Sequence, residues 1–133
     1  MDSIRTGLAM GADRGILLKQ DPAADEYARA VALAAAIKEE SPDLVLAGHV
    51  AADDGSSQVP TRIAEILGLP HVNVITNIEI ADGKAVCTSE ADGGTQVTEV
   101  TLPAVISSQV SWNEPRYPSM KGIMQAKKKP VAT

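Results

Sequence analysis

The chain has 133 residues, which is enough for one compact domain with a core of ordinary size. With one Trp, two Tyr and no Phe, the core must consist mainly of Leu, Ile and Val packed against Ala. The formal net charge of −5 argues against a nucleic-acid binder, which would carry a basic face. A single cysteine, Cys87, excludes an internal disulfide, and no apolar stretch is long enough for membrane insertion. Since the first residues do not resemble a signal peptide, we expect a soluble cytoplasmic protein.

The first half of the sequence alternates between helical and strand patterns. Asp21 and Pro22 suit a helix start, and Gly68 suits a helix end. In chain order we expect a short helix (Ser3–Gly11), a short strand (Arg14–Leu18), a helix from Asp21 to about Glu40, a strand covered on both faces (Asp43–Gly48) and a helix from near Ser57 to Gly68. Helical spacing predicts that the buried side chains are Tyr27, Ala30, Val31, Ala34 and Ile37 on the first long helix, and Val59, Ile63, Ile66 and Leu67 on the second.

The second half is rich in β-branched residues and reads mostly as strands. Asp82-Gly83 is a strong hairpin signal, and the Gly pair after Asp92 marks another turn. The expected strands are His71–Ile80, Ala85–Glu90, Thr95–Leu102 and Ala104–Ser107, followed by a long exposed segment from Ser111 to Thr133. The sequence therefore predicts an α/β fold, in which a parallel sheet with flanking helices is followed by an antiparallel β portion.

The loop Gly48–Gln58 is the first candidate site, because it joins a buried strand to a helix. Such a junction places free N–H groups and a positive helix end at the carboxyl edge of a sheet, where phosphates bind. Two interpretations remain open. The amides of residues 55–58 could cradle a phosphate. Alternatively, Asp54 or Ser56 could cap the helix in a solvated loop, since Asp53 and Asp54 would repel an anion unless they point away. The loop lacks the Gly and Lys pattern of a P-loop.

The other candidate residues give weaker support for a functional site. His49 and His71 have no cysteine or carboxylate cluster at metal-ligand spacing, so a metal site is not expected. Cys87 is expected to be a packed, inert thiol. The apolar residues of Trp112–Met124 either fold onto their own domain or anchor a partner, and the lysines of Lys127–Lys129 usually form a solvated tail.

Four motifs in order along the chain resemble the beta subunit of electron-transfer flavoprotein. They are Leu8–Arg14, the loop with Ile63–Pro70, Glu90–Gly94 with Leu102–Ser107, and Asn113–Lys129. The resemblance implies a partial adenine-nucleotide-binding (HUP-like) fold that pairs with an alpha subunit, which holds most of the FAD. It also implies that the beta subunit binds AMP, and that the dimer carries electrons from acyl-CoA and related dehydrogenases to the quinone pool. Such a subunit is an electron carrier and not an enzyme.

The resemblance also implies roles for particular residues. Glu90 would contact the mobile flavin domain of the alpha subunit. The segment around Met120 would dock on dehydrogenases through an apolar anchor. The resemblance therefore favours a partner surface over folding of these apolar residues onto their own domain. The implied AMP-binding residues are Gly48, His49, Val50, Ala51, Ala52, Asp53, Asp54, Gly55, Ser56, Ser57, Gln58 and Val59, and the implied docking residues are Tyr117, Met120, Ile123, Met124, Lys127 and Lys128.

Compared with the family, the chain looks like the latter part of a beta subunit, without its first strands and its C-terminal arm. We therefore expect a truncated nucleotide-binding domain at residues 1–110 and a docking loop with a basic tail at residues 111–133. An unpaired sheet edge would favour a homo-oligomer. The alternative to an electron-carrier subunit is a non-redox module that binds nucleotide or self-associates. The expected location is the cytoplasm of a bacterium, or the mitochondrial matrix in a eukaryote.

Overall fold

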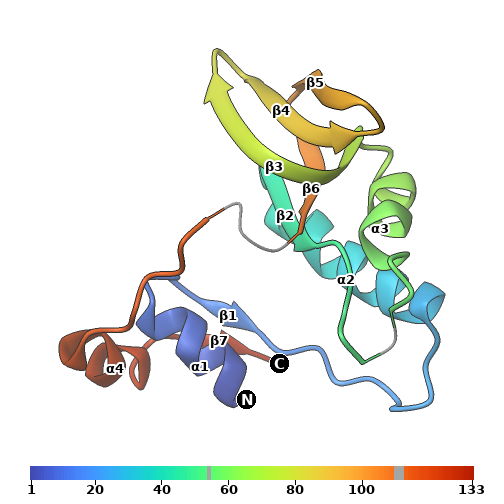
Figure 1. Ribbon diagram of the computed structural model, residues 1–133. Coiled ribbons are helices and arrows are strands. Elements are labelled where there is room, and N and C mark those ends of the chain that lie inside the picture. Colours follow the sequence, from blue (N-terminus) through green and yellow to red (C-terminus); the bar gives the residue numbers. More distant parts are fainter. Residues whose placement is uncertain (54, 110–112) are drawn as a thin grey trace. The chain divides into compact units, whose positions relative to one another are not determined.

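Figure 1 shows the computed structural model, which describes residues 1–53, 55–109 and 113–133. The chain forms two compact units. We call Pro22–Asn113 the sheet unit, and Met1–Asp21 with Glu114–Thr133 the terminal unit. The functional division expected at residue 110 stays a prediction, because these units are defined by contacts within the chain and not by function.

The sheet unit is built on a five-stranded sheet in the order β2-β6-β3-β4-β5. Strand β6 pairs in parallel with both β2 and β3, whereas β3–β4 and β4–β5 are antiparallel. This mixed sheet with flanking helices confirms the predicted α/β fold. Its elements are α2 (Glu26–Glu40), β2 (Leu44–Gly48), α3 (Val59–Leu67), β3 (His71–Ala81), β4 (Lys84–Ala91), β5 (Gly94–Thr101) and β6 (Ala104–Ser108).

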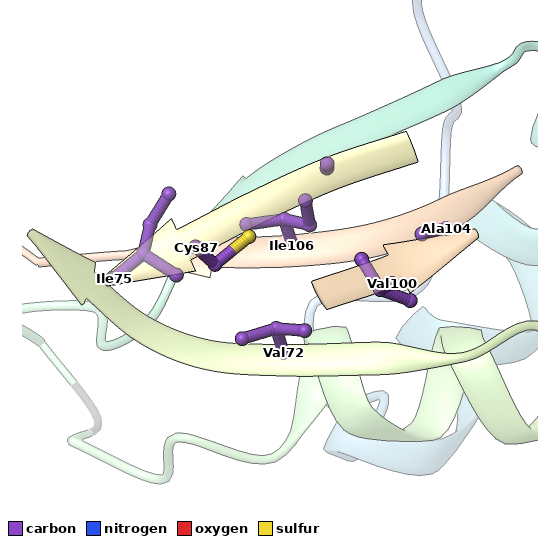
Figure 2. Close-up of a cluster of buried hydrophobic side chains, with 7 residues drawn as sticks. Val72, Ile75, Cys87, Val100, Ala104 and Ile106 are labelled. Carbon is purple, nitrogen blue, oxygen red and sulfur yellow. The ribbon is translucent and has the colours of Figure 1, made fainter. Parts of the chain in front are cut away.

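Strand β6 contributes to two hydrophobic clusters because successive side chains point to opposite faces of a sheet. On one face, Ile106 packs with Cys87 and other side chains of β3, β4 and β5 (Figure 2). On the other, Val105 packs with Ala30 and Ala34 of α2 and with residues of α3. Cys87 is fully buried, and burial raises the pKa of its thiol. The prediction of a packed cysteine is confirmed.

The hairpins follow from their turn residues. Asp82 and Gly83 both have positive φ, 52° and 73°, as the tight two-residue turn between β3 and β4 requires. At the next hairpin Gly93 has a φ of 84°. The predicted turns are therefore confirmed.

The start of α2 differs from the sequence prediction. The helix begins at Glu26 and not after Asp21, because the carboxylate of Asp25 accepts a 2.8 Å hydrogen bond from the amide of Ala28. Its buried stripe is also narrower than expected. Ala30 and Ala34 are buried, whereas Tyr27 and Val31 are exposed.

Two other burial predictions are wrong in the sheet unit. Strand β2 is not covered on both faces, because Leu46 is 52% exposed, and it lies at the edge of the sheet. Strand β6 takes the interior position between β2 and β3. On α3, Ile63 faces the core as predicted, but Ile66 is exposed.

The terminal unit pairs the two ends of the chain. Its elements are α1 (Asp2–Ala9), β1 (Gly15–Ile16), α4 (Met120–Ala126) and β7 (Val131–Ala132), and β1 pairs in parallel with β7. Nη1 of Arg5 donates to the carbonyls of Ala126 (2.6 Å) and Lys129 (3.1 Å), which lie at the end of α4 and beyond it. Nζ of Lys129 donates in return to the carbonyls of Leu8 (3.0 Å) and Ala12 (2.6 Å).

The C-terminal segment is mostly exposed, as predicted, but its second half also forms a helix and a short strand, which the sequence did not predict. Ser119 caps α4 by accepting a hydrogen bond from the amide of Gly122 at 3.0 Å. Gly122 itself allows close approach to α1, since a Cβ there would lie 2.5 Å from the carbonyl oxygen of Ala9. Local capping and a close helix contact give this Lys-rich segment a fixed structure, and Lys129 is part of it.

Candidate functional site

The loop between β2 and α3, residues 49–58, encloses a small hollow of about 90 Å³. It follows the end of β2, on the edge of the sheet where the parallel strand β6 also ends. Seven of the predicted AMP-binding residues line it. The lining residues are Gly48, His49, Ala51, Ser56, Ser57, Gln58, Val59 and Pro60.

The backbone of the loop shows which amides are available to a ligand. The N–H of Gly55 donates to the carbonyl of Ala51 at 3.0 Å, so it is committed within the loop and does not belong to the expected cradle. Ser57 has a φ of 55°, which is uncommon for a residue with a side chain. In the described part of the chain, the amides of Ser57 and Gln58 make no hydrogen bond. These two amides are the donors that the loop offers.

The side chain of Gln58 is held on the helix side of the loop. Its Oε1 accepts hydrogen bonds from Nε (3.1 Å) and Nη2 (2.6 Å) of Arg62, one turn further along α3. The guanidinium of Arg62 in turn lies 5.7 Å from the centre of the Tyr27 ring. This arrangement ties the start of α3 to α2 and leaves the backbone of Gln58 at the hollow.

A polar chain of three side chains lies beside the hollow. Ser107 of β6 is fully buried, and its hydroxyl donates to Oδ1 of Asn73 at 3.1 Å. Nδ1 of His49 lies 3.4 Å from the same hydroxyl oxygen. The amide of His49 also donates to the carbonyl of Ser108 at 2.9 Å, so both its backbone and its side chain are attached to β6.

The second histidine, His71, lies in an environment that disfavours its protonated form. Burial, and then the nearby charge of His49, lower the pKa of His71. Its Nε2 is buried and has no hydrogen-bond partner among the described residues. Desolvation thus favours the neutral form of His71.

The remaining predicted residues of the loop do not line the hollow. These are Val50, Ala52, Asp53 and Gly55, and Val50 is 47% exposed. Asp54, predicted at the same site, lies outside the described residues. Asp53 is thus not among the lining residues, so its carboxylate is not one of the groups that an anion in the hollow would contact.

The predicted docking residues surround α4 in the terminal unit. Tyr117, Met120 and Met124 are 95%, 79% and 65% exposed, and Ile123 is partly exposed. Lys127 and Lys128 follow the helix and are exposed as well. Trp112, part of the same predicted segment, lies outside the described residues. The structure thus gathers apolar and basic side chains on one short helix and its flanks.

A second hollow, of about 600 Å³, lies between α1 and α4. Arg5 and Lys127 line it together with small apolar residues such as Ala9 and Ala126. Glu90, the predicted flavin-domain contact, belongs to the sheet unit. It is exposed near the end of β4, where it pairs with Thr95 of β5.

Sequence reasoning missed two members of the polar chain, Asn73 and Ser107. Asn73 is the one amide near the start of a β-branched strand, and Val74 beside it has a positive φ of 54°. A polar residue in such a run is the signal that could have drawn attention to it. Ser107 gave no such signal, because a serine at the end of an apolar strand is common.

In open α/β sheets, a loop at the carboxyl end of a parallel strand is a common position for ligand sites. The family model for the electron transfer flavoprotein domain matches residues 1–133. The chain belongs to the electron transfer flavoprotein family.

Relatives support the same assignment at the level of the subunit. The electron transfer flavoprotein subunit beta of Syntrophomonas wolfei is 86% identical over 133 residues, which cover 100% of this chain and 53% of the relative. The subunit beta of Bradyrhizobium diazoefficiens is 41% identical over 131 residues, covering 98% of this chain and 53% of the relative. The mitochondrial subunit beta of Arabidopsis thaliana is 38% identical over 133 residues, with 98% and 53% coverage. The resemblance to a beta subunit is confirmed, and the chain spans about half the length of these relatives.

Among the described residues, no three His, Cys, Asp or Glu side chains are grouped so that they could hold a metal ion. None of the helices in residues 1–53, 55–109 and 113–133 is both long and apolar enough to cross a membrane.

Proposed function

We propose that this chain serves as the nucleotide-binding and partner-docking part of an electron-transfer flavoprotein beta subunit, which carries electrons together with an alpha subunit. The observation that carries the proposal is the family match over residues 1–133, combined with the loop between β2 and α3. The bound FAD, shared with the alpha subunit, supplies the redox chemistry. The residues of this chain would bind the nucleotide, help to orient the flavin and recognise the partner proteins.

The loop provides the groups that an adenylate phosphate needs. Among the described residues, no group accepts a hydrogen bond from the amides of Ser57 and Gln58, and α3 begins directly behind them, which favours negative charge at its N-terminus. The hollow of about 90 Å³ is smaller than the roughly 300–1,000 Å³ of a complete ligand pocket. It therefore fits one part of AMP, and the rest of the nucleotide would contact surface beyond the loop.

Helix α4 provides the proposed docking surface for dehydrogenases. Met120 and Met124 are flexible apolar side chains that adapt to a partner pocket, and the neighbouring lysines attract acidic surfaces. Glu90 is proposed to contact the flavin-binding domain of the alpha subunit. The proposed route runs from acyl-CoA and related dehydrogenases to the quinone pool, in a bacterial cytoplasm or a mitochondrial matrix.

A second function is favoured by the edge of the sheet. Within the described sheet, β2 pairs with β6 and is the outermost strand, and Leu46 of β2 is half exposed. An open edge of this kind pairs readily with another strand. The alternative is thus a non-redox module that binds nucleotide or forms homo-oligomers through β2.

Native mass spectrometry of the chain, alone and co-expressed with an alpha subunit, separates these functions. The electron-carrier proposal predicts a heterodimer that retains FAD and AMP. Ligand-free oligomers of this chain that ignore the alpha subunit would contradict it and support the alternative. Replacing Leu46 by Lys should abolish those oligomers if they form through β2, since a charge would then lie in the contact.

A further inference from the structure

We propose that His49 accepts a hydrogen bond from a donor group of the bound adenylate, and that Ser107 and Asn73 position it by fixing which ring nitrogen carries the proton. This inference rests on the proposed adenylate site and specifies how that site selects its ligand. The donor is a ribose hydroxyl or the exocyclic amino group of adenine. Both present the same chemistry, an uncharged O–H or N–H.

The hydrogen atoms of the polar chain can be counted. A serine hydroxyl has a single hydrogen, and Ser107 donates it to Oδ1 of Asn73. Its oxygen can then only accept from His49. Nδ1 of His49 must therefore carry a hydrogen, and in the neutral imidazole Nε2 is left with a lone pair.

That lone pair lies on the part of the ring that is not directed at Ser107. Nδ1 faces the buried Ser107, and the two nitrogens of an imidazole point in divergent directions, so Nε2 faces away from β6. His49 lines the hollow, and no hydrogen bond from its Nε2 is present in the described part of the chain. One residue of the lining, His49, therefore carries an unused acceptor, Nε2.

The acceptor gives the loop two chemically different contacts. The amides of Ser57 and Gln58 are donors and suit phosphate oxygens, whereas a neutral Nε2 repels phosphate oxygens and attracts O–H and N–H groups. An anion alone would satisfy only the first contact. A nucleoside monophosphate, which has both an anionic end and neutral donors, satisfies both.

Nuclear magnetic resonance tests the proton arrangement without any ligand. Long-range ¹H–¹⁵N correlation spectra at about pH 8, where an ordinary histidine is neutral, report the tautomer of His49, with His71→Gln used for assignment. The full chain should show the Nδ1–H form. In Asn73→Ala the Ser107 hydroxyl is released to donate to Nδ1, so the Nε2–H form should increase.

Asn73 is exposed, so this variant is expected to fold, and Ser107→Ala provides a second measurement in which the Nδ1–H preference should also weaken. A predominant Nε2–H form in the unmodified chain would overturn the inference. An unchanged tautomer in Asn73→Ala would overturn the positioning role of Asn73 and Ser107.

Calorimetry tests the ligand contact. His49→Ala should weaken AMP binding about tenfold, the typical value of one hydrogen bond, and leave inorganic phosphate binding unchanged. With the unmodified chain, weaker binding of 2′-deoxy-AMP or 3′-deoxy-AMP identifies a ribose hydroxyl as the donor, and weaker binding of inosine monophosphate identifies the amino group. His49→Ala should lose this discrimination.

The results separate this inference from the proposed site. If the unmodified chain binds AMP and all of these analogues equally, or if His49→Ala binds AMP as tightly, the inference fails and the adenylate site stands. If the unmodified chain with its alpha subunit binds no AMP, the adenylate site fails and the ligand contact of His49 fails with it.

Discussion

The two units of this chain differ sharply in charge. The terminal unit has eight Lys and Arg against four Asp and Glu, a formal charge of +4, while the sheet unit has four against thirteen, a formal charge of −9. The net charge of −5 conceals this division. The basic, Met-rich terminal unit suits acidic protein partners. Because the sheet unit is negative overall, its electrostatic field does not attract anions, and anion binding there must depend on local amides.

We expect the terminal unit to be less stable than the sheet unit, because a few specific contacts hold its two short helices together. We expect Gly122→Ala to destabilise this unit by about 1–3 kcal/mol, since the new Cβ would meet the backbone of Ala9 at 2.5 Å. Gly7→Ala is a matched control on α1. Its Cβ meets nothing within 4 Å, so it should stabilise α1 by about 0.5–1 kcal/mol.

Amide hydrogen exchange of α1 and α4 measures both variants. We expect faster exchange in Gly122→Ala, with the sheet unit unchanged. Equal protection of α4 in the two variants would mean that the close contact between the helices does not exist in solution.

The docking role of α4 is tested by introducing a glutamate on α4 and, as a control, a glutamate on the sheet unit. Met120→Glu should weaken docking to an acyl-CoA dehydrogenase about tenfold or more, because a carboxylate would be desolvated in the contact. Val97→Glu is the control in the sheet unit, where Val97 is 65% exposed. Electron-transfer rates of the complete dimer give the readout, and unchanged transfer with Met120→Glu would exclude the anchor role.

The sheet unit should be the more sensitive of the two to mild acid. Burial lowers the pKa of His71 below that of the unfolded chain, so the unfolded state takes up the proton first. Its contribution to stability is complete above about pH 6.5 and is lost as the pH falls below that value. Urea unfolding at about pH 7.5 and 5.5 should show a smaller loss in His71→Gln, and equal losses would contradict a buried neutral His71.

The sequence predicted the elements that local chemistry determines. Asp82-Gly83 demanded a tight hairpin, and Gly68 ended α3, as the structure shows. The alternation of helix and strand placed the candidate loop at the end of β2. These features depend on a few adjacent residues, so no tertiary information was needed.

The sequence failed where distant segments decide the outcome. The edge position of β2 depends on which strands β6 pairs with, and no local pattern contains that information. The same holds for Ser107 and Asn73, which meet His49 from separate strands. The contact of Arg5 with the end of α4 joins residues 121 positions apart, so it was equally invisible.

We expect adenylate to bind at the loop after β2 and not on the basic terminal unit. Titrating AMP into ¹⁵N-labelled chain, in complex with its alpha subunit, and following the amide resonances tests this most directly. We predict saturable shifts at Ser57 and Gln58, with α4 unaffected. Shifts confined to the lysines after α4, or none at the loop, would contradict the account.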